Sequence, residues 1–297
     1  MISRREFLAA PLAVASTAAL ISAVPKPGGV KIGCQTNAWR IDPNNFDSLL
    51  AVLGKLKELG YEGYETGFRN VQGQFENAAT ARKQLEKFGL KFLGCHIFLD
   101  EYDPETRIPP LELIKKVAAG AAKLGGQRVI VSGKGVTGKG PDGGDSLSTA
   151  LLFPKIFGLR EAASYCSSLG LRLAYHNHAP EFALGGLELN ELIDATSQSR
   201  LDFLIDCGWA FQAKVNVPEF FAKHHKRIIG LHLRDFKDGQ QVPLGQGEFP
   251  IRELAAAIKK ANWTGWVINE EERLSGEKPG EKAVAPARQT LKQAFGK

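Results

Sequence analysis

The feature that most constrains the fold is a regular alternation of short apolar runs and longer amphipathic segments, which starts at residue 30. Eight apolar runs are predicted strands: 30–35, 63–66, 91–96, 128–132, 172–176, 202–206, 228–233 and 265–270. The segments between and after them have apolar residues three and four positions apart and are predicted helices: 46–59, 78–88, 111–124, 153–169, 187–195, 218–224, 251–261 and 285–295. Strands that alternate with helices are typical of a parallel sheet.

Glycines mark where several helices end. Gly60, Gly89, Gly125 and Gly170 each follow a Leu or Phe and precede a predicted strand, as expected of left-handed helix C-caps. Eight strand–helix units in about 270 residues predict an α/β fold, a closed (β/α)8 TIM barrel that forms a single domain over residues 28–297. The alternative is an open doubly wound sheet, which normally has fewer units and a glycine-rich first βα turn; the turn here is Gln35-Thr36-Asn37-Ala38.

The first 27 residues have the pattern of an export signal. Arg4 and Arg5 directly precede an Ala/Leu/Val-rich run that ends near Pro25, which indicates a twin-arginine signal peptide over residues 1–27. A membrane anchor is disfavoured because Pro11 and the many alanines make the run only mildly apolar. The pattern predicts the twin-arginine translocase as a partner and a periplasmic or other extracytoplasmic location. It does not say whether the signal is cleaved.

Charge and cysteine content narrow the class of ligand. The formal net charge of +6 is spread along the chain, so it suits a neutral or anionic small molecule and gives no reason to expect nucleic acid. The four cysteines form no C-x-x-C pair, and we expect them to be small buried hydrophobes. The oligomeric state cannot be predicted from these features.

Ionisable side chains follow four consecutive predicted strands. His176, with His178 and Glu181 after it, ends the fifth strand; Asp206 ends the sixth; His232 lies in the seventh; and Glu270 ends the eighth. In a TIM barrel these strand ends converge at one rim. Because ionisable groups inside apolar strands are costly unless they are paired or bind a metal, we predict a mononuclear divalent metal site there.

The motifs around these residues resemble those of the sugar phosphate isomerase/epimerase family, the xylose isomerase-like barrels. The resemblance covers residues 30–290 and rests on five motifs in the family's order: 175–182 (YHNHAPEF), 205–209 (IDCGW), 231–235 (LHLRD), 244–247 (LGQG) and 265–270 (GWVINE). Together they are specific for the superfamily and not for one reaction.

The resemblance implies that a divalent metal is held by Glu, Asp, His and Glu from strands five to eight. Asp206, His232 and Glu270 match three of these positions. At the fifth strand His176 stands where many relatives have glutamate, so the ligand is either His176 itself or Glu181, five residues later. We favour Glu181 because an HNH-x-x-EF form recurs in one branch of the family. Glu181 and Glu270 are also the expected pair of catalytic acid–base residues.

Several neighbouring residues are predicted to contact substrate. His178 lies two residues from His176 and Arg234 two residues from His232, so each pair shares a strand face. The resemblance adds His96, which ends strand three, and His176 if it is not a ligand. Glu65 is included because it lies near the end of strand two. Arg234 could instead pair with Asp235. Trp209 could offer an apolar face to a sugar ring or simply pack in the core.

The function implied is a metal-dependent isomerase or epimerase that acts through an enediolate on a keto or aldo sugar, a small-molecule carbohydrate. Mn²⁺ is the expected ion, with Mg²⁺, Co²⁺ and Zn²⁺ as alternatives. The same enediolate can lose a β-substituent, which would make the protein a dehydratase or lyase. A third alternative is a non-catalytic exported sugar-binding barrel.

Two other functions are disfavoured. The segment 133–139 (GKGVTGK) imitates a phosphate-binding P-loop, but Gly140 follows where a Ser or Thr is required, so we expect a βα loop over the site. An abasic-site endonuclease shares the barrel but needs a multi-zinc cluster, and the chain has only 6 histidines and no basic stripe for a phosphate backbone.

Overall fold

Eight parallel strands close into a barrel in the computed structural model, which describes residues 29–99, 101–140, 143–273 and 275–296. The order around the barrel is β1-β12-β9-β8-β7-β4-β3-β2, and β1 pairs with both β12 and β2. The barrel strands are β1 (Lys31–Gln35), β2 (Gly63–Gly67), β3 (Lys91–Ile97), β4 (Arg128–Val131), β7 (Arg172–His176), β8 (Leu201–Asp206), β9 (Ile228–Leu233) and β12 (Trp266–Asn269). The predicted single-domain TIM barrel is confirmed.

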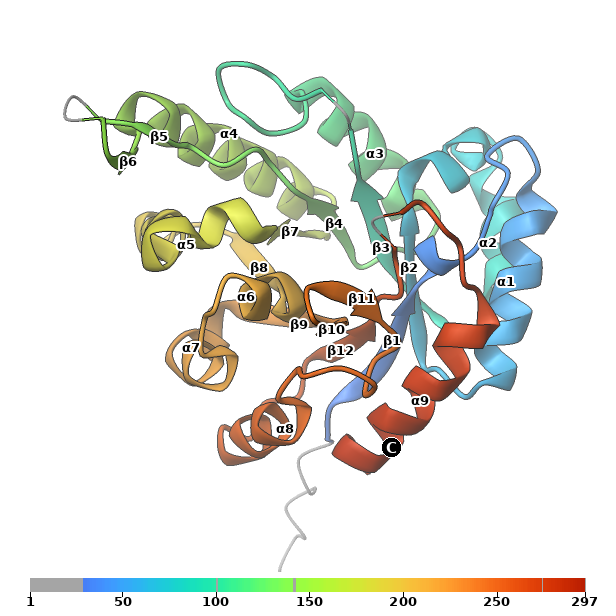
Figure 1. Cartoon of the computed structure of the whole chain (residues 1–297). Helices are drawn as coiled ribbons and strands as arrows, with labels where there is room; N and C mark the ends of the chain where they lie inside the picture. The colour runs from blue at the N-terminus through green and yellow to red at the C-terminus, as the bar shows by residue number, and fades with distance from the viewer. Residues whose placement is uncertain (1–28, 100, 141–142, 274, 297) are drawn as a thin grey trace, which may run out of the picture.

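Helices surround the strands (Figure 1). They are α1 (Phe46–Glu58), α2 (Ala78–Glu86), α3 (Leu111–Lys123), α4 (Thr149–Ser168), α5 (Ala183–Ala195), α6 (Cys207–Gln212), α7 (Val217–His224), α8 (Ile251–Lys260) and α9 (Glu281–Phe295). Two hairpins that were not predicted, β5 (Thr137–Lys139) with β6 (Asp145–Leu147) and β10 (Asp235–Lys237) with β11 (Gln240–Val242), lie in βα loops. The segment that imitates a P-loop therefore runs into the first hairpin instead of a helix.

The predicted helix ends agree with the backbone. Gly60, Gly89, Gly125 and Gly170 all have positive φ, between 69° and 82°, as a left-handed C-cap requires. In α5 the backbone at Leu184, Gly185 and Gly186 is left-handed, so the regular helix starts only after Gly186, close to the predicted start at residue 187.

The barrel holds two apolar layers. The main core lies between the strands and the helices, and a smaller cluster from five strands fills the barrel interior: Leu93, Ile130, Ala174, Leu204, Trp266 and Ile268. Residues two apart on a strand share a face, so the interior residues Leu204, Ala174 and Ile268 are followed on the same face by Asp206, His176 and Glu270. The apolar interior is therefore the floor of a polar layer at the carboxyl ends of the strands.

Two further sequence predictions concern the cysteines and the N-terminal segment. The four cysteines are buried and free, which confirms that they pack as small hydrophobes. The predicted twin-arginine signal, residues 1–27, lies outside the described residues. Among the described helices none combines the length and apolar character needed to cross a membrane.

Candidate metal centre

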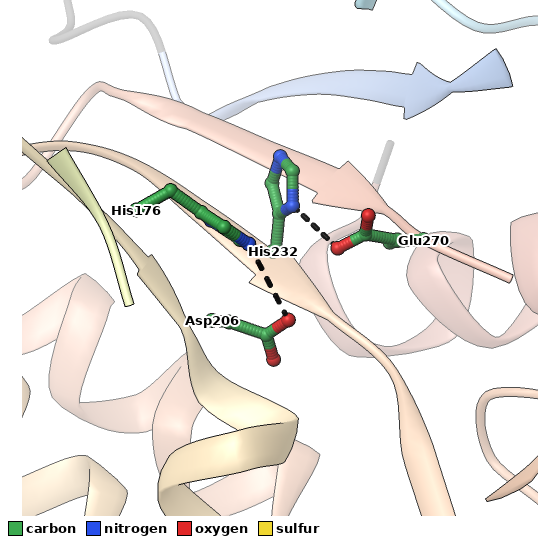
Figure 2. Close-up of side chains that lie close together, drawn as sticks. All are labelled: His176, Asp206, His232 and Glu270. Carbon is green, nitrogen blue, oxygen red and sulfur yellow. Dashed lines mark hydrogen bonds and ion pairs between the residues drawn. The ribbon is translucent and has the colours of Figure 1, made fainter. Parts of the chain in front are cut away.

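Four side chains from neighbouring strands meet above the apolar interior. His176 ends β7, Asp206 ends β8, His232 lies in β9 and Glu270 directly follows β12. One ligand atom from each lies within 4.8 Å of the ligand atoms of the other three, and all four residues are buried (Figure 2). The strand register explains the convergence. Asp206 of β8 pairs with His232 of β9, and Ile268 of β12, two residues before Glu270, pairs with the same histidine. We call these four residues the cluster.

The aspartate is held by the helix that follows it. Its Oδ1 accepts a hydrogen bond from the backbone N–H of Trp209 at 3.0 Å, so Asp206 is the N-cap of α6. The other oxygen, Oδ2, is left facing the cluster, 3.8 Å from Nε2 of His176. Asn177 fixes the spacing of the two strands, because its Oδ1 accepts from the backbone N–H of Asp206 at 3.0 Å.

His232 lies between two carboxylates. Its Nδ1 is 2.6 Å from Oε2 of Glu270, and its Nε2 is 2.7 Å from Oε2 of Glu65. Burial alone would lower its pKa, but the two carboxylates outweigh burial and raise the pKa to about 9. Without a metal, His232 is therefore an imidazolium at neutral pH.

Glu65 forms a second layer beneath the cluster. It pairs with the buried guanidinium of Arg128, and its Oε2 is also 2.8 Å from Nε2 of His96. Burial would raise its pKa, but Arg128 and His232 hold it well below the ordinary value for a glutamate. Glu65, predicted to contact substrate, is fully buried and instead orients the rings of two histidines.

Arg234 supplies the cation nearest the cluster. Its Nε lies 2.9 Å from Oδ2 of Asp206, and a terminal nitrogen lies 2.5 Å from Oε2 of Glu270. Gly208 makes room for this arginine, since a Cβ at that position would clash with its Cγ. Asp235, offered as the alternative partner, instead accepts backbone hydrogen bonds from the loop 245–249.

His176 gives the clearest sign that the cluster suits a metal. It is fully buried, and neither of its ring nitrogens has a hydrogen-bond partner among the described residues. Burial lowers its pKa well below the ordinary value, so the ring is neutral and retains a lone pair. A buried imidazole without partners is costly unless an ion binds it. Two imidazoles and two carboxylates are a donor set that first-row divalent metals accept, so these residues fit such an ion.

Glu181, predicted both as a ligand and as a catalytic residue, lies in a different polar group. Its Oε1 accepts from the hydroxyl of Tyr175 at 2.6 Å, and its Oε2 accepts from the backbone N–H of His178 at 3.1 Å. The second bond closes the short turn Ala179–Phe182, and the Glu181 carboxylate is not among the groups that converge in the cluster. At the fifth strand it is His176, the alternative ligand, that joins the other three in the cluster.

The group behind Glu181 is also buried. Lys155, fully buried, donates to Oε1 of Glu188 at 2.6 Å and lies 4.8 Å from the ring centre of Tyr175. The other carboxylate oxygen of Glu188 accepts from the backbone N–H of Val136 at 2.8 Å. This group therefore ties the loops after β4 and β7 to α4 and α5.

The remaining predicted residues surround the cluster. His178 packs edge-on against His176, and burial and then Arg234 lower its pKa to about 4, so it is neutral at pH 7. His96 stacks on His232 with ring centres 5.1 Å apart. Trp209 is half-buried under the guanidinium of Arg234, 5.4 Å from the ring centre, and packs on Phe236, so it supports the arginine.

Three contributors were missed by sequence analysis. Asn37 donates to Oε1 of Glu270 at 2.8 Å, Arg128 neutralises Glu65, and Asn177 joins the ends of β7 and β8. Each lies at an end of a barrel strand or one turn beyond it. Among sequence features, only this position could have indicated that they belong to the site. Asn37 and Arg128 have partners 233 and 63 residues away, which local patterns do not reveal.

Comparisons with known proteins agree with this architecture. Residues 53–294 match a family model described as "Xylose isomerase-like TIM barrel". An inosose dehydratase from Bacillus licheniformis is 24% identical over 255 residues, which cover 76% of this chain and 82% of that protein.

Two solved structures have the same fold. D-allulose 3-epimerase from a Methylomonas species, in complex with D-allulose, superposes with a TM-score of 0.69 at 17% identity, covering 91% of this chain and 98% of that one. The 3-keto-D-glucoside 4-epimerase of E. coli superposes with a TM-score of 0.67 at 16% identity, covering 89% and 98%. Through the family match over most of its length, the chain belongs to the xylose isomerase-like TIM barrel family.

Proposed function

We propose that this protein is a divalent-metal-dependent enzyme that isomerises or epimerises a keto or aldo sugar through an enediolate, with the metal held by His176, Asp206, His232 and Glu270. The observation that carries the proposal is the buried imidazole of His176, which has no hydrogen-bond partner in the part of the chain that the structure describes and lies within 4.8 Å of two carboxylates and a second imidazole. The family of sugar-converting barrels to which the chain belongs supports it. Manganese is the ion we propose, as carboxylate and imidazole ligands accept it readily.

A divalent ion at this position would polarise a substrate carbonyl and so lower the barrier to removal of the neighbouring proton. The protein's own part is to move that proton. Glu270 is the base we propose, because Arg234 and His232 outweigh burial and hold its pKa well below the ordinary value, so it is ionised at neutral pH. Arg234 also places positive charge beside the negative charge that develops on the substrate.

A second group is needed to return the proton on the other face. We propose His178, which is partly exposed at the rim and adjacent to His176. Because it is neutral at pH 7, it would act as a relay: one ring nitrogen gives its proton to the enediolate while the other takes a proton from water. Glu181, the partner expected from the sequence, lies outside the cluster, and its carboxylate accepts hydrogen bonds from Tyr175 and from the backbone of His178. We therefore assign Glu181 to holding the loop that carries His178.

A second candidate function is dehydration of a keto-sugar at the same site. It is favoured by the similarity to an inosose dehydratase, which extends over most of both chains. Both reactions begin by removing the proton next to the carbonyl, and they differ in the step that follows. An epimerase or isomerase returns a proton, whereas a dehydratase expels a hydroxyl from the next carbon.

Nuclear magnetic resonance in D2O tests the proposed function. The full chain with Mn²⁺ is incubated with a panel of keto-sugars, free and glycosidic, and the Mn²⁺ is removed by chelation before spectra are recorded. Epimerisation should give deuterium at the carbon next to the carbonyl together with a new stereoisomer. Loss of the signal of the carbon that carried the hydroxyl, with a new signal from the dehydrated product, would establish the dehydratase. A non-catalytic sugar-binding barrel would give neither, and would sink both proposals.

Metal affinity should depend on pH with a defined sign. With no ion bound, His232 has a pKa of about 9, and it must lose its proton to become a ligand. Between pH 9 and about pH 6, where Asp206 also begins to bind a proton, the apparent affinity should therefore fall about tenfold for each pH unit of acidification, and about one proton should be released per ion bound at pH 7. Calorimetric titration with Mn²⁺ in buffers of different ionisation enthalpy counts that proton. Affinity that is constant from pH 6 to pH 8 would contradict this assignment.

We further propose that the protein acts outside the cytoplasm. The basis is the pattern of residues 1–27, with Arg4 and Arg5 before an apolar run. Replacing both arginines by lysine should retain the protein inside the cell, and immunoblotting of periplasmic and cytoplasmic fractions would show it.

A further inference from the structure

We propose that a cavity beside the cluster is a subsite for a second, neutral sugar ring, so that the preferred substrate is a glycoside or disaccharide and not a free monosaccharide. This inference rests on the proposed function, since it places the reacting sugar at the cluster. The cavity has a volume of about 630 Å³ and lies at the carboxyl ends of β1, β2 and β3, next to the segment after β12. Its described lining includes Gln35, Asn37, Trp39, Phe98, Glu272 and Lys278.

Three lining residues of the cavity contact Glu270 of the cluster or residues packed against the cluster. Asn37 donates to Oε1 of Glu270 at 2.8 Å. Phe98 stacks on His96, with ring centres 5.0 Å apart and planes at 11°. Glu272 lies 3.8 Å from Arg234. These contacts place the cavity directly beside the cluster.

The cavity lies beside the cluster. None of the four cluster residues is among its described lining residues, so a ring that fills it is not the ring whose carbonyl reaches the cluster. A volume of this size is within the range of about 300–1,000 Å³ that is typical of whole ligand sites. It therefore accommodates a substantial part of a ligand beyond the reacting ring.

The polar atoms of the lining favour hydroxyl groups as partners. Nε2 of Gln35, Oδ1 of Asn37 and Nε1 of Trp39 are buried and have no hydrogen-bond partner among the described residues. The orientation of Gln35 is fixed, because its Oε1 accepts from the backbone N–H of Asn37 at 3.1 Å. Two donors and one acceptor within one lining match hydroxyls, which both donate and accept.

Charge and aromatic content point to a neutral sugar ring. The charged lining residues are Arg40 and Lys278, which are positive, and Asp42 and Glu272, which are negative, so their formal charges cancel. This balance gives no advantage to a phosphate or carboxylate. The half-buried rings of Trp39 and Phe98 supply apolar faces of the kind that pack on the C–H face of a pyranose.

Calorimetry at 25 °C with unoxidised sugars tests the subsite separately from the reaction. The full chain is titrated with cellobiose, maltose, lactose and sucrose, and with glucose, methyl β-D-glucoside and glucose 6-phosphate. At least one disaccharide should bind about tenfold more tightly than glucose and the methyl glucoside. Trp39→Ala should remove that advantage and Phe98→Leu should reduce it, while Trp39→Phe, which keeps a ring face, should retain most of it.

The control is Trp263→Phe, because Trp263 packs on Phe221 and donates to the backbone of Ile228, at the start of β9 and so at the opposite end of the barrel. It should leave the disaccharide advantage unchanged. Three results would each overturn the subsite. All the sugars bind equally or not at all, the disaccharide advantage survives both Trp39→Ala and Phe98→Leu, or glucose 6-phosphate binds most tightly. If free keto-sugars exchange deuterium but disaccharides bind no more tightly than glucose, the proposed reaction stands and the subsite is wrong. If disaccharide binding depends on Trp39 but no sugar exchanges deuterium, the subsite stands and the proposed reaction is wrong.

Discussion

Replacing Glu270 by glutamine should lower the rate of deuterium exchange into a keto-sugar by about 10²–10⁴-fold, the range typical of losing a general base. The amide keeps the shape of the side chain but cannot accept the proton. It also weakens the cluster, since Oε2 of Glu270 contacts both His232 and Arg234. The measurement is the initial rate of exchange at saturating Mn²⁺, so that reduced metal affinity does not limit it.

Glu181→Gln is the matched comparison, because it makes the same chemical change in the other candidate carboxylate. The hydrogen bonds of Glu181 to Tyr175 and to the backbone of His178 indicate a role in holding the loop. Its exchange rate at saturating Mn²⁺ should therefore stay within about tenfold of the unmodified protein, well above that of Glu270→Gln. If the two variants lose the same rate, Glu181 is a catalytic partner and His178 is not.

Glu65→Gln should destabilise the protein by about 3–5 kcal/mol, because it leaves the buried guanidinium of Arg128 without its counter-charge. Arg128 has 3% of its surface exposed and Glu65 has none, so water cannot replace the lost partner. The same substitution removes the carboxylate that faces Nε2 of His232. Metal affinity should therefore also fall, by about 10–100-fold, as is typical when the group that orients a ligand is lost.

The double variant Glu65→Gln/Arg128→Met separates these two effects. With both charges removed, most of the lost free energy of unfolding should return, whereas the metal affinity should stay low because His232 still lacks the carboxylate that faces its Nε2. Urea unfolding measures the first quantity and calorimetric titration with Mn²⁺ the second. Recovery of both in the double variant would show that Glu65 acts only by balancing Arg128.

The barrel could be predicted because its signals are local. Each predicted strand is a short apolar run, and the glycines at 60, 89, 125 and 170 adopt the positive φ that a helix end requires. The hairpin of β5 and β6 was not predicted, since its strands are three residues each and partly exposed, without the apolar run that marks a barrel strand. Its glycine-rich start resembles a P-loop only in sequence.

Residues of the site could be predicted only where their position on a strand determines the direction of the side chain. Asp206, His232 and Glu270 end or lie within apolar strands, so their alternation with interior residues directs them to one rim. The choice between His176 and Glu181 depends on the turn after β7. In that turn the backbone N–H of His178 donates a hydrogen bond to Glu181. Strand periodicity does not predict such a bond, because the turn is outside the strand. The contribution of Arg128 was hidden because its partner is 63 residues away.

The most direct test of the central claim, that the cluster is a metal site, is the metal content of the full chain and its variants after purification from the native compartment. Mass-spectrometric elemental analysis should find one divalent ion per chain, with manganese as the expected element. Asp206→Ala, His232→Ala and His176→Ala should each lose it, while Glu181→Ala should keep it. Full metal content in Asp206→Ala and His232→Ala, or loss of the ion in Glu181→Ala but not in His176→Ala, would contradict the centre as described.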